Sequence, residues 1–129
     1  MDEFTINEMK EMQLILQEKY KDKWEGISVL AGRNKLLWMI GEIGEVIDIV
    51  KKHGDFEAAH QEDIRKDLIE ELADVLMYYN DILLCYDISS EELKTAYKEK
   101  FPGEILIAFD TKLADGVYAL YKDNDSRTK

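Results

Sequence analysis

LLWMIGEIGEVIDIVKK, residues 36–52, carries apolar residues at helical spacing and predicts an amphipathic helix. At about 100° per residue, one apolar stripe runs along this helix, and we expect that stripe to lie in the core. Its members are Leu36, Ile40, Ile43, Ile47 and Val50. Glu42 and Glu45 do not share the stripe. They interrupt a second apolar row, which includes Trp38 and Ile49, so this row is not an ordinary solvated face.

Gly41 and Gly44 stand directly before the two glutamates. Each glycine weakens a helix by up to about 1 kcal/mol relative to alanine. Because they lack side chains, they allow another helix or a ligand to approach the backbone beside the carboxylates. Close helix packing and ligand access both account for them.

A second acidic pair lies on the next long helix, expected over about residues 64–86. Glu71 falls close to the apolar line of this helix, and Asp74 follows one turn later. If the two helices pack antiparallel, Glu42-x-x-Glu45 and Glu71-x-x-Asp74 converge, since residues i and i+3 project side by side. Buried carboxylates must be paired or must coordinate a metal. Oxygen-only ligation suits Mg²⁺ or Mn²⁺.

Capping residues and breakers set the remaining helix limits. A capping box at Thr5 predicts a helix to about Lys21, and Asn34 is the expected N-cap of the helix over residues 36–52. Residues 53–63 are expected to form a loop with at most one short helical turn. The sequence SSEE at residues 89–92 predicts a fourth helix that ends before Pro102. Beyond it the spacing of Ile105, Phe109, Leu113, Val117 and Leu120 favours a helix over a strand.

Composition bounds the class of protein. The chain has 129 residues, which suits one all-α domain over residues 1–122 and a polar tail over residues 123–129. Its net charge of -11 repels nucleic acid and anionic membranes, so we expect neither as a partner. Cys85 is the only cysteine and is expected to be a buried apolar side chain. Without an internal disulfide, and without a signal peptide or membrane span, the expected location is the cytoplasm.

Two segments together resemble a known family. GEIGEVIDIVKK at residues 41–52, followed by EELADVLMYYNDI at residues 70–82, is similar to the E-x-x-E, spacer, E-x-x-D signature of the MazG-like all-α nucleoside triphosphate pyrophosphohydrolases. Relatives of this group include dimeric dUTPases and phosphoribosyl-ATP pyrophosphatase. The resemblance covers about residues 36–86, and EKFPG at residues 99–103 also resembles a stretch found in some members. It implies a four-helix-bundle-like fold whose core is completed by oligomerisation, as a homodimer or a dimer of dimers.

The resemblance also implies an activity and a set of ligands. Glu42, Glu45, Glu71 and Asp74 match the positions that bind Mg²⁺, with Mn²⁺ as a possible substitute. The implied reaction is hydrolysis of a nucleoside triphosphate at the α–β phosphate linkage, giving monophosphate and pyrophosphate, in house-cleaning of the nucleotide pool. Glu45 is the expected general base.

Five further residues are candidates for substrate binding, and each has a structural alternative. Lys51 and Lys52 can reach phosphate oxygens or simply favour the helix dipole, while Tyr78 can line the pocket or lie in the core. Trp24 and Trp38 can stack on a base or belong to the core.

Alternatives to this function remain open. The same fold can act specifically on dUTP, dCTP or phosphoribosyl-ATP. A non-catalytic acidic interaction module, with its carboxylates paired to Arg33, Lys35 or Arg65, also fits the sequence.

Overall fold

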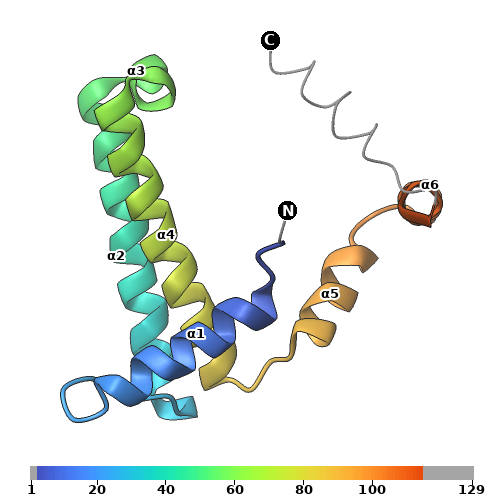
Figure 1. The fold of residues 1–129 in the computed structure, drawn as a ribbon, viewed down its shortest axis with the longest axis horizontal. Helices are drawn as coiled ribbons and strands as arrows, with labels where there is room; N and C mark the ends of the chain where they lie inside the picture. Colours follow the sequence, from blue (N-terminus) through green and yellow to red (C-terminus); the bar gives the residue numbers. More distant parts are fainter. Residues whose placement is uncertain (1–2, 115–129) are drawn as a thin grey trace. The chain divides into compact units, whose positions relative to one another are not determined.

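The chain is all helical over the part that its computed structural model describes, residues 3–114, where no strand occurs. Two compact units divide after Ser90 and are described separately. Figure 1 shows the helices. They are α1 (Ile6–Lys19), α2 (Val29–His53), α3 (Asp55–His60), α4 (Glu62–Cys85), α5 (Ser90–Glu99) and α6 (Gly103–Ala114). The predicted all-α class is confirmed.

The first unit is built on the antiparallel pair α2 and α4 (Figure 1). The short helix α3 joins them at one end, after α2 stops at Gly54, whose φ of 86° is a conformation that favours glycine. At the other end α1 packs against α4. Two long helices of opposite direction therefore face each other along most of their length, as the convergence of the two acidic pairs requires.

Most predicted helix limits are confirmed within about two residues. α1 begins after Thr5, whose Oγ1 accepts a hydrogen bond from the Glu8 backbone N–H at 3.2 Å. In the second unit α5 ends at Glu99, before Pro102, and α6 confirms the helix expected after it. The part of that expectation on Val117 and Leu120 lies outside the described residues, as does the polar tail. The single domain over residues 1–122 stays a prediction.

The predicted start of α2 is wrong. The helix begins five residues before Asn34, and its N-cap is Ser28, whose Oγ accepts from the Ala31 backbone N–H at 3.1 Å. The Asn34 amide instead donates to both carboxylate oxygens of Glu25, at 2.9 and 3.1 Å. Both serine and asparagine suit an N-cap. Asn34 already has a partner in the preceding loop, which leaves the cap to Ser28.

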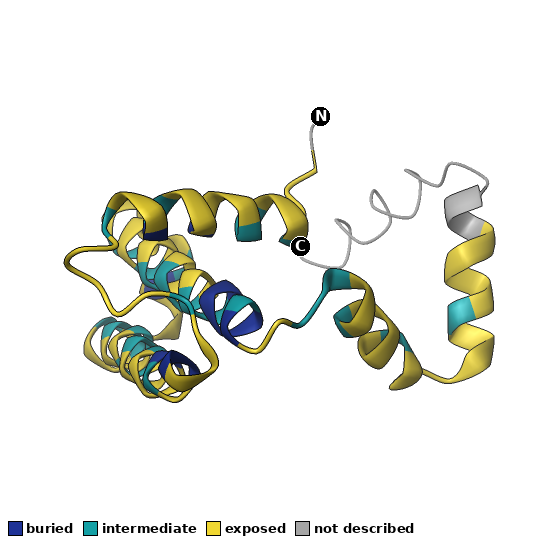
Figure 2. Ribbon diagram, turned by 90° about the horizontal axis from the view of Figure 1, so that it is seen from below, coloured by how far each residue is buried: buried dark blue, intermediate teal, exposed yellow. Residues whose placement is uncertain are grey.

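Within the described residues of the first unit, the apolar stripe of α2 is not buried in a core, contrary to expectation. Four of its members, Leu36, Ile40, Ile43 and Ile47, are 38% to 62% exposed, and Val50 is half-buried. Figure 2 shows that exposed residues make up most of the described helices. The face that packs against α4 is the neighbouring row, which carries the two glutamates. Among described residues the buried apolar side chains are few. They are Ala31, Ala58, Ile82, Leu83 and Cys85.

Candidate functional site

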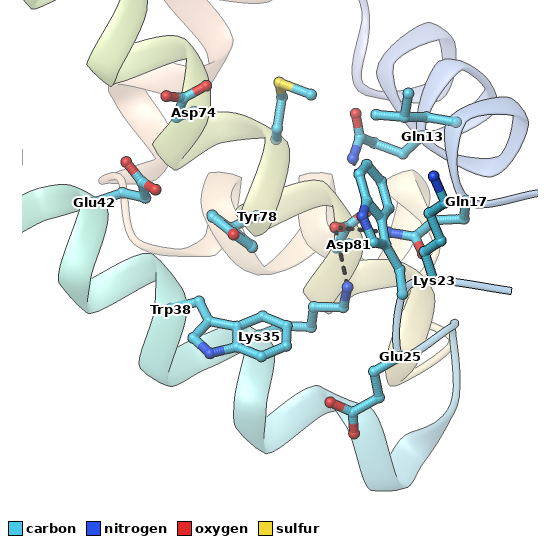
Figure 3. A pocket seen from close by; sticks show the side chains of 13 residues that line it. Gln13, Gln17, Lys23, Glu25, Lys35, Trp38, Glu42, Asp74, Tyr78 and Asp81 are labelled. Carbon is cyan, nitrogen blue, oxygen red and sulfur yellow. Dashed lines mark hydrogen bonds and ion pairs between the residues drawn. The ribbon is translucent and has the colours of Figure 1, made fainter. Parts of the chain in front are cut away.

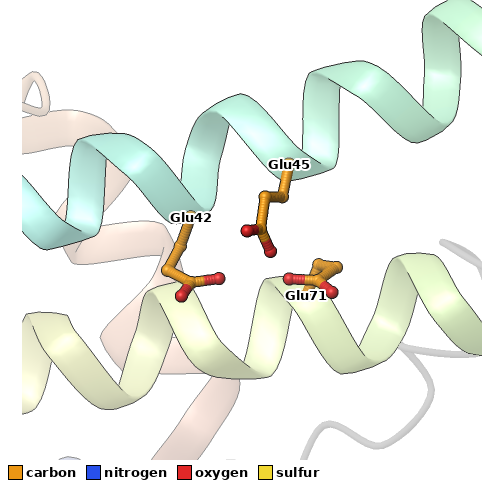
Figure 4. A group of neighbouring side chains, drawn as sticks. All are labelled: Glu42, Glu45 and Glu71. Atoms are coloured by element: carbon orange, nitrogen blue, oxygen red, sulfur yellow. The ribbon is translucent and has the colours of Figure 1, made fainter.

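Three carboxylates converge between the two long helices. Glu42 and Glu45 extend from α2 toward α4, and Glu71 extends from α4 toward α2 (Figure 4). One carboxylate oxygen of each residue lies within 4.8 Å of the other two. The helical spacing of three residues places the first two side by side, and the antiparallel packing of α4 supplies the third. We refer to these three residues as the carboxylate trio.

The trio is electrostatically strained. A hydrogen bond with the Glu45 carboxyl, reinforced by burial and by the Glu45 charge, raises the pKa of Glu71 from 4.5 to about 7. Burial, followed by the charge of Glu45, raises the pKa of Glu42. The Oε2 atoms of Glu42 and Glu71 are both buried and have no hydrogen-bond partner in the described part of the chain. Buried acceptors of this kind are costly unless a proton or a cation satisfies them.

No basic side chain neutralises the trio within residues 3–114. Lys35 pairs with Asp81 instead, and the Nη1 of Arg65 donates to the Ala59 carbonyl at 3.0 Å. Lys35 and Arg65 therefore do not form the ion pairs with the trio that were expected of a non-catalytic module. An oxygen-only set with orphaned acceptors and no counter-charge fits a hard divalent cation.

Asp74 lies beside the trio and is not one of the three that converge. Its half-buried carboxylate lines a cavity together with Glu42, and Figure 3 shows the two side chains facing each other. The negative charge of Asp74 contributes to the raised pKa of both Glu42 and Glu71. Asp74 is thus close enough to take part in a site that the trio begins.

The cavity extends from Glu42 and Asp74 toward α1 and has a volume of about 490 Å³. Three aromatic residues named from the sequence line it, Trp24, Trp38 and Tyr78. The rings of Trp38 and Tyr78 are 6.2 Å apart and tilted by 56°. Burial, with the charge of Glu42 next, raises the pKa of Tyr78, so its hydroxyl stays protonated at neutral pH. Aromatic walls of this kind suit a flat ligand.

Lys51 and Lys52 are placed elsewhere. Both lie in the last turn of α2, are exposed, and do not line the cavity. They follow Glu45 by six and seven residues, which is a rise of about 9 to 10 Å along the helix.

Sequence reasoning missed a buried polar cluster at the far end of the cavity. Asp81 accepts hydrogen bonds from the side-chain amides of Gln13 and Gln17 and pairs with Lys35 (Figure 3). The signal was present in the sequence. Gln13 and Gln17 fall on the same face of α1 as the apolar Met9 and Leu16, where a polar pair is unexpected.

The site has a regular register. Four side chains of α2 face four side chains of α4, and on each helix these four are spaced by three, four and three residues. Because the helices are antiparallel, the first position on one meets the last position on the other. The resulting pairs are Lys35 with Asp81, Trp38 with Tyr78, Glu42 with Asp74, and Glu45 with Glu71.

Fold and site together define an all-α protein with an acidic centre beside an aromatic-lined cavity. A model of the MazG nucleotide pyrophosphohydrolase domain family matches residues 32–102, more than half of the chain. The chain belongs to this family. No curated protein and no solved structure matches it. In the described part of the chain, no helix combines the length and the apolar character that crossing a membrane requires.

Proposed function

We propose that the protein hydrolyses a nucleoside or deoxynucleoside triphosphate at the α–β phosphate linkage, in a Mg²⁺-dependent reaction that yields monophosphate and pyrophosphate. One observation carries the proposal. Among the residues that the structure describes, the carboxylate trio has orphaned oxygens and no basic partner, and it opens beside a cavity whose aromatic walls suit a base. The proposed cellular role is house-cleaning of the cytoplasmic nucleotide pool.

The cation would be held by the trio, with Asp74 adjacent. When bound, Mg²⁺ or Mn²⁺ neutralises phosphate charge and lowers the pKa of a water. Glu45 is the exposed member of the trio, and we propose that it acts as the general base that accepts the proton of the attacking water. The water oxygen forms a bond to the α-phosphorus, the bond to the α–β bridging oxygen breaks, and pyrophosphate leaves.

The test is pyrophosphate release from a panel of nucleoside triphosphates with Mg²⁺, with Mn²⁺ and with a chelator. We expect metal-dependent release with monophosphate as coproduct. Glu42→Gln should reduce kcat by at least about a hundredfold, because it removes a ligand and its charge. Glu70→Gln changes an exposed neighbour on α4 by the same chemistry and should retain activity. Including dUTP, dCTP and phosphoribosyl-ATP in the panel decides among the narrower substrates.

Failure has a clear form. If the folded wild-type protein releases no pyrophosphate from any substrate, the result would favour the non-catalytic module. An equal loss of kcat in Glu42→Gln and Glu70→Gln would show that the rate depends on the total negative charge rather than on the trio.

Lys51 and Lys52 are proposed to contact the outer phosphates. Replacing both with alanine should raise KM for the triphosphate severalfold and leave kcat nearly unchanged, since such contacts hold substrate and transition state alike. An unchanged KM would assign these lysines to the helix terminus alone.

A homodimer, or a dimer of dimers, is proposed to cover the exposed stripe of α2. Its support is the 38% to 62% exposure of four large aliphatic side chains in one row. Light scattering coupled to size exclusion measures the mass. A monomer at micromolar concentration would contradict the proposal.

A further inference from the structure

The buried polar cluster of Gln13, Gln17, Lys35 and Asp81 closes the end of the cavity away from the carboxylate trio. Gln13 Nε2 donates to Asp81 Oδ1 at 2.8 Å, and Gln17 Nε2 donates to Asp81 Oδ2 at 3.2 Å. Lys35 Nζ lies 3.6 Å from the same Oδ2. The cluster combines residues of α1, α2 and α4, and α1 lies outside the segment that matches the family.

The cluster contains an unsatisfied acceptor. Asp81 as a carboxylate only accepts hydrogen bonds, so each glutamine must turn its NH₂ group toward it. This fixes the amide orientation and leaves the Gln17 carbonyl oxygen facing elsewhere. That oxygen, Oε1, is buried and has no hydrogen-bond partner among the described residues. A buried acceptor without a donor is costly, and a donor on a ligand would satisfy it.

The cluster also contains a donor with spare capacity. Lys35 is 3% exposed, and its ammonium carries three N–H donors. Within the described residues its polar contact is Asp81 alone, whose charge the two glutamines share, and its other contact is the Trp38 ring at 5.4 Å. Lys35 and Gln17 meet at the same Asp81 oxygen. A residue with an unsatisfied acceptor and a residue with a cationic donor therefore contact the same Asp81 oxygen, and both residues line the cavity.

The ligand group that complements this arrangement is an N–H donor beside a carbonyl oxygen. A carbonyl oxygen has two lone pairs and tolerates a broad range of donor directions, whereas a ring nitrogen has one lone pair that must point at the ammonium. Uracil, guanine and hypoxanthine carry such an N–H and carbonyl pair. Cytosine and adenine instead place an amino group beside a ring nitrogen.

We propose that Gln17 and Lys35 read the base of the substrate, with Gln17 Oε1 accepting from a ring N–H and Lys35 Nζ donating to the neighbouring carbonyl, so that keto bases are preferred. This rests on the proposed function for the position of the base, with the phosphates at the trio. The two tryptophans of the chain, Trp24 and Trp38, both line the cavity and flank the bound base.

Equilibrium binding of monophosphates tests the proposal without turnover. Quenching of tryptophan fluorescence reports the cavity, since both tryptophans line it. The pairs dUMP against dCMP, and dIMP against dAMP, change the edge of the base with little change in its size. The wild type should bind the keto member of each pair at least about tenfold more tightly, because the ring nitrogen of the amino member carries no hydrogen to donate to the buried Gln17 acceptor.

Two matched variants assign the preference to one atom. Gln17→Met removes the orphan acceptor together with one donor to Asp81 and should reduce the preference to about twofold or less. Gln13→Met removes an equivalent donor to Asp81 but leaves the Gln17 carbonyl in place, so its preference should persist. The helical content of both variants is checked first. Lys35→Arg keeps the charge and serves as a second probe if Gln17→Met fails to fold, because the longer group should weaken keto-base binding selectively.

Four outcomes would overturn the proposal. They are equal binding of both members of each pair by the wild type, tighter binding of the amino member, binding of neither member, and a keto preference unchanged in Gln17→Met. Failure of the proposed function would look different, because keto preference in binding would then persist with no pyrophosphate released from any triphosphate.

Discussion

Metal binding to the trio should depend steeply on pH because of one carboxyl group. Glu71 has a pKa of about 7 without metal, raised by its hydrogen bond with Glu45. A cation must displace this proton before it can bind the carboxylate. Affinity for Mg²⁺ or Mn²⁺ should therefore rise as pH increases through 7 and level off above it.

The magnitude follows from the pKa. With a value of about 7, roughly one Glu71 in eleven is ionised at pH 6 and roughly ten in eleven at pH 8. The apparent dissociation constant should fall about tenfold between these two pH values. The raised pKa of Glu42 acts in the same direction.

The same shift has a consequence for stability, of opposite sign. The pKa of Glu71 is about 7 in the folded chain and 4.5 ordinarily. Between pH 4.5 and pH 7, the folded chain therefore keeps a proton on Glu71 that the unfolded chain has lost. Its contribution to the stability of the metal-free protein is complete below pH 4.5 and is lost as pH rises through 7. Mg²⁺ should restore stability at pH 8.

Isothermal titration calorimetry between pH 6 and 8 measures this, and two buffers with different heats of ionisation count the protons released. Glu71→Gln should remove most of the pH dependence, leaving the part due to Glu42, and should weaken binding at pH 8 by at least about tenfold. Glu70→Gln is the matched control on the same helix and should behave as the wild type. An affinity that is constant from pH 6 to 8, or proton release as large in Glu71→Gln as in the wild type, would refute the reasoning.

Three further predictions concern stability and are measured by urea unfolding at equilibrium. Gly44→Ala should stabilise α2 by up to about 1 kcal/mol, because an added Cβ meets no atom within 4 Å; destabilisation would instead reveal a partner packed there. Gly32→Ala should destabilise by about 1–3 kcal/mol, because its Cβ would lie 2.6 Å from the Tyr86 ring, and unchanged stability would mean that the ring moves freely. Asp81→Asn should destabilise by about 3–5 kcal/mol, because it leaves the charge of Lys35 buried and unpaired; a loss below about 1 kcal/mol would contradict that account.

The helices and the convergence of three carboxylates could be predicted from the sequence because both follow from local geometry. Periodicity identifies the helices, and a spacing of three residues places Glu42 beside Glu45 on any helix. Only one assumption about tertiary structure was needed, the antiparallel packing of the next long helix. Glu71 then met the pair as expected.

What sequence reasoning missed depends on contacts between distant segments. Periodicity shows that α2 has an apolar stripe, and it cannot show whether the same chain covers that stripe. The described residues of the first unit leave it exposed. The position of Gln13 and Gln17 on the apolar face of α1 is visible in the sequence, but their partner is not, because Asp81 lies 68 and 64 residues away. Asp74 has the right spacing from Glu71, yet its place beside the cavity follows from the rotation of α4 and not from the motif.

One quantity, the register of α2 against α4, positions both ends of the site. A buried ion pair adds little net stability compared with apolar packing. If α2 slipped by one residue against α4, however, the buried charges of Lys35 and Asp81 would both lose their partner. The pair therefore opposes any slip and fixes where Glu45 meets Glu71, about 15 Å further along the helix. It follows that Asp81→Asn should weaken metal binding at the trio as well as stability, although it touches none of the three carboxylates. A variant that loses stability but keeps wild-type metal affinity while folded would show that the helices hold their register without the ion pair.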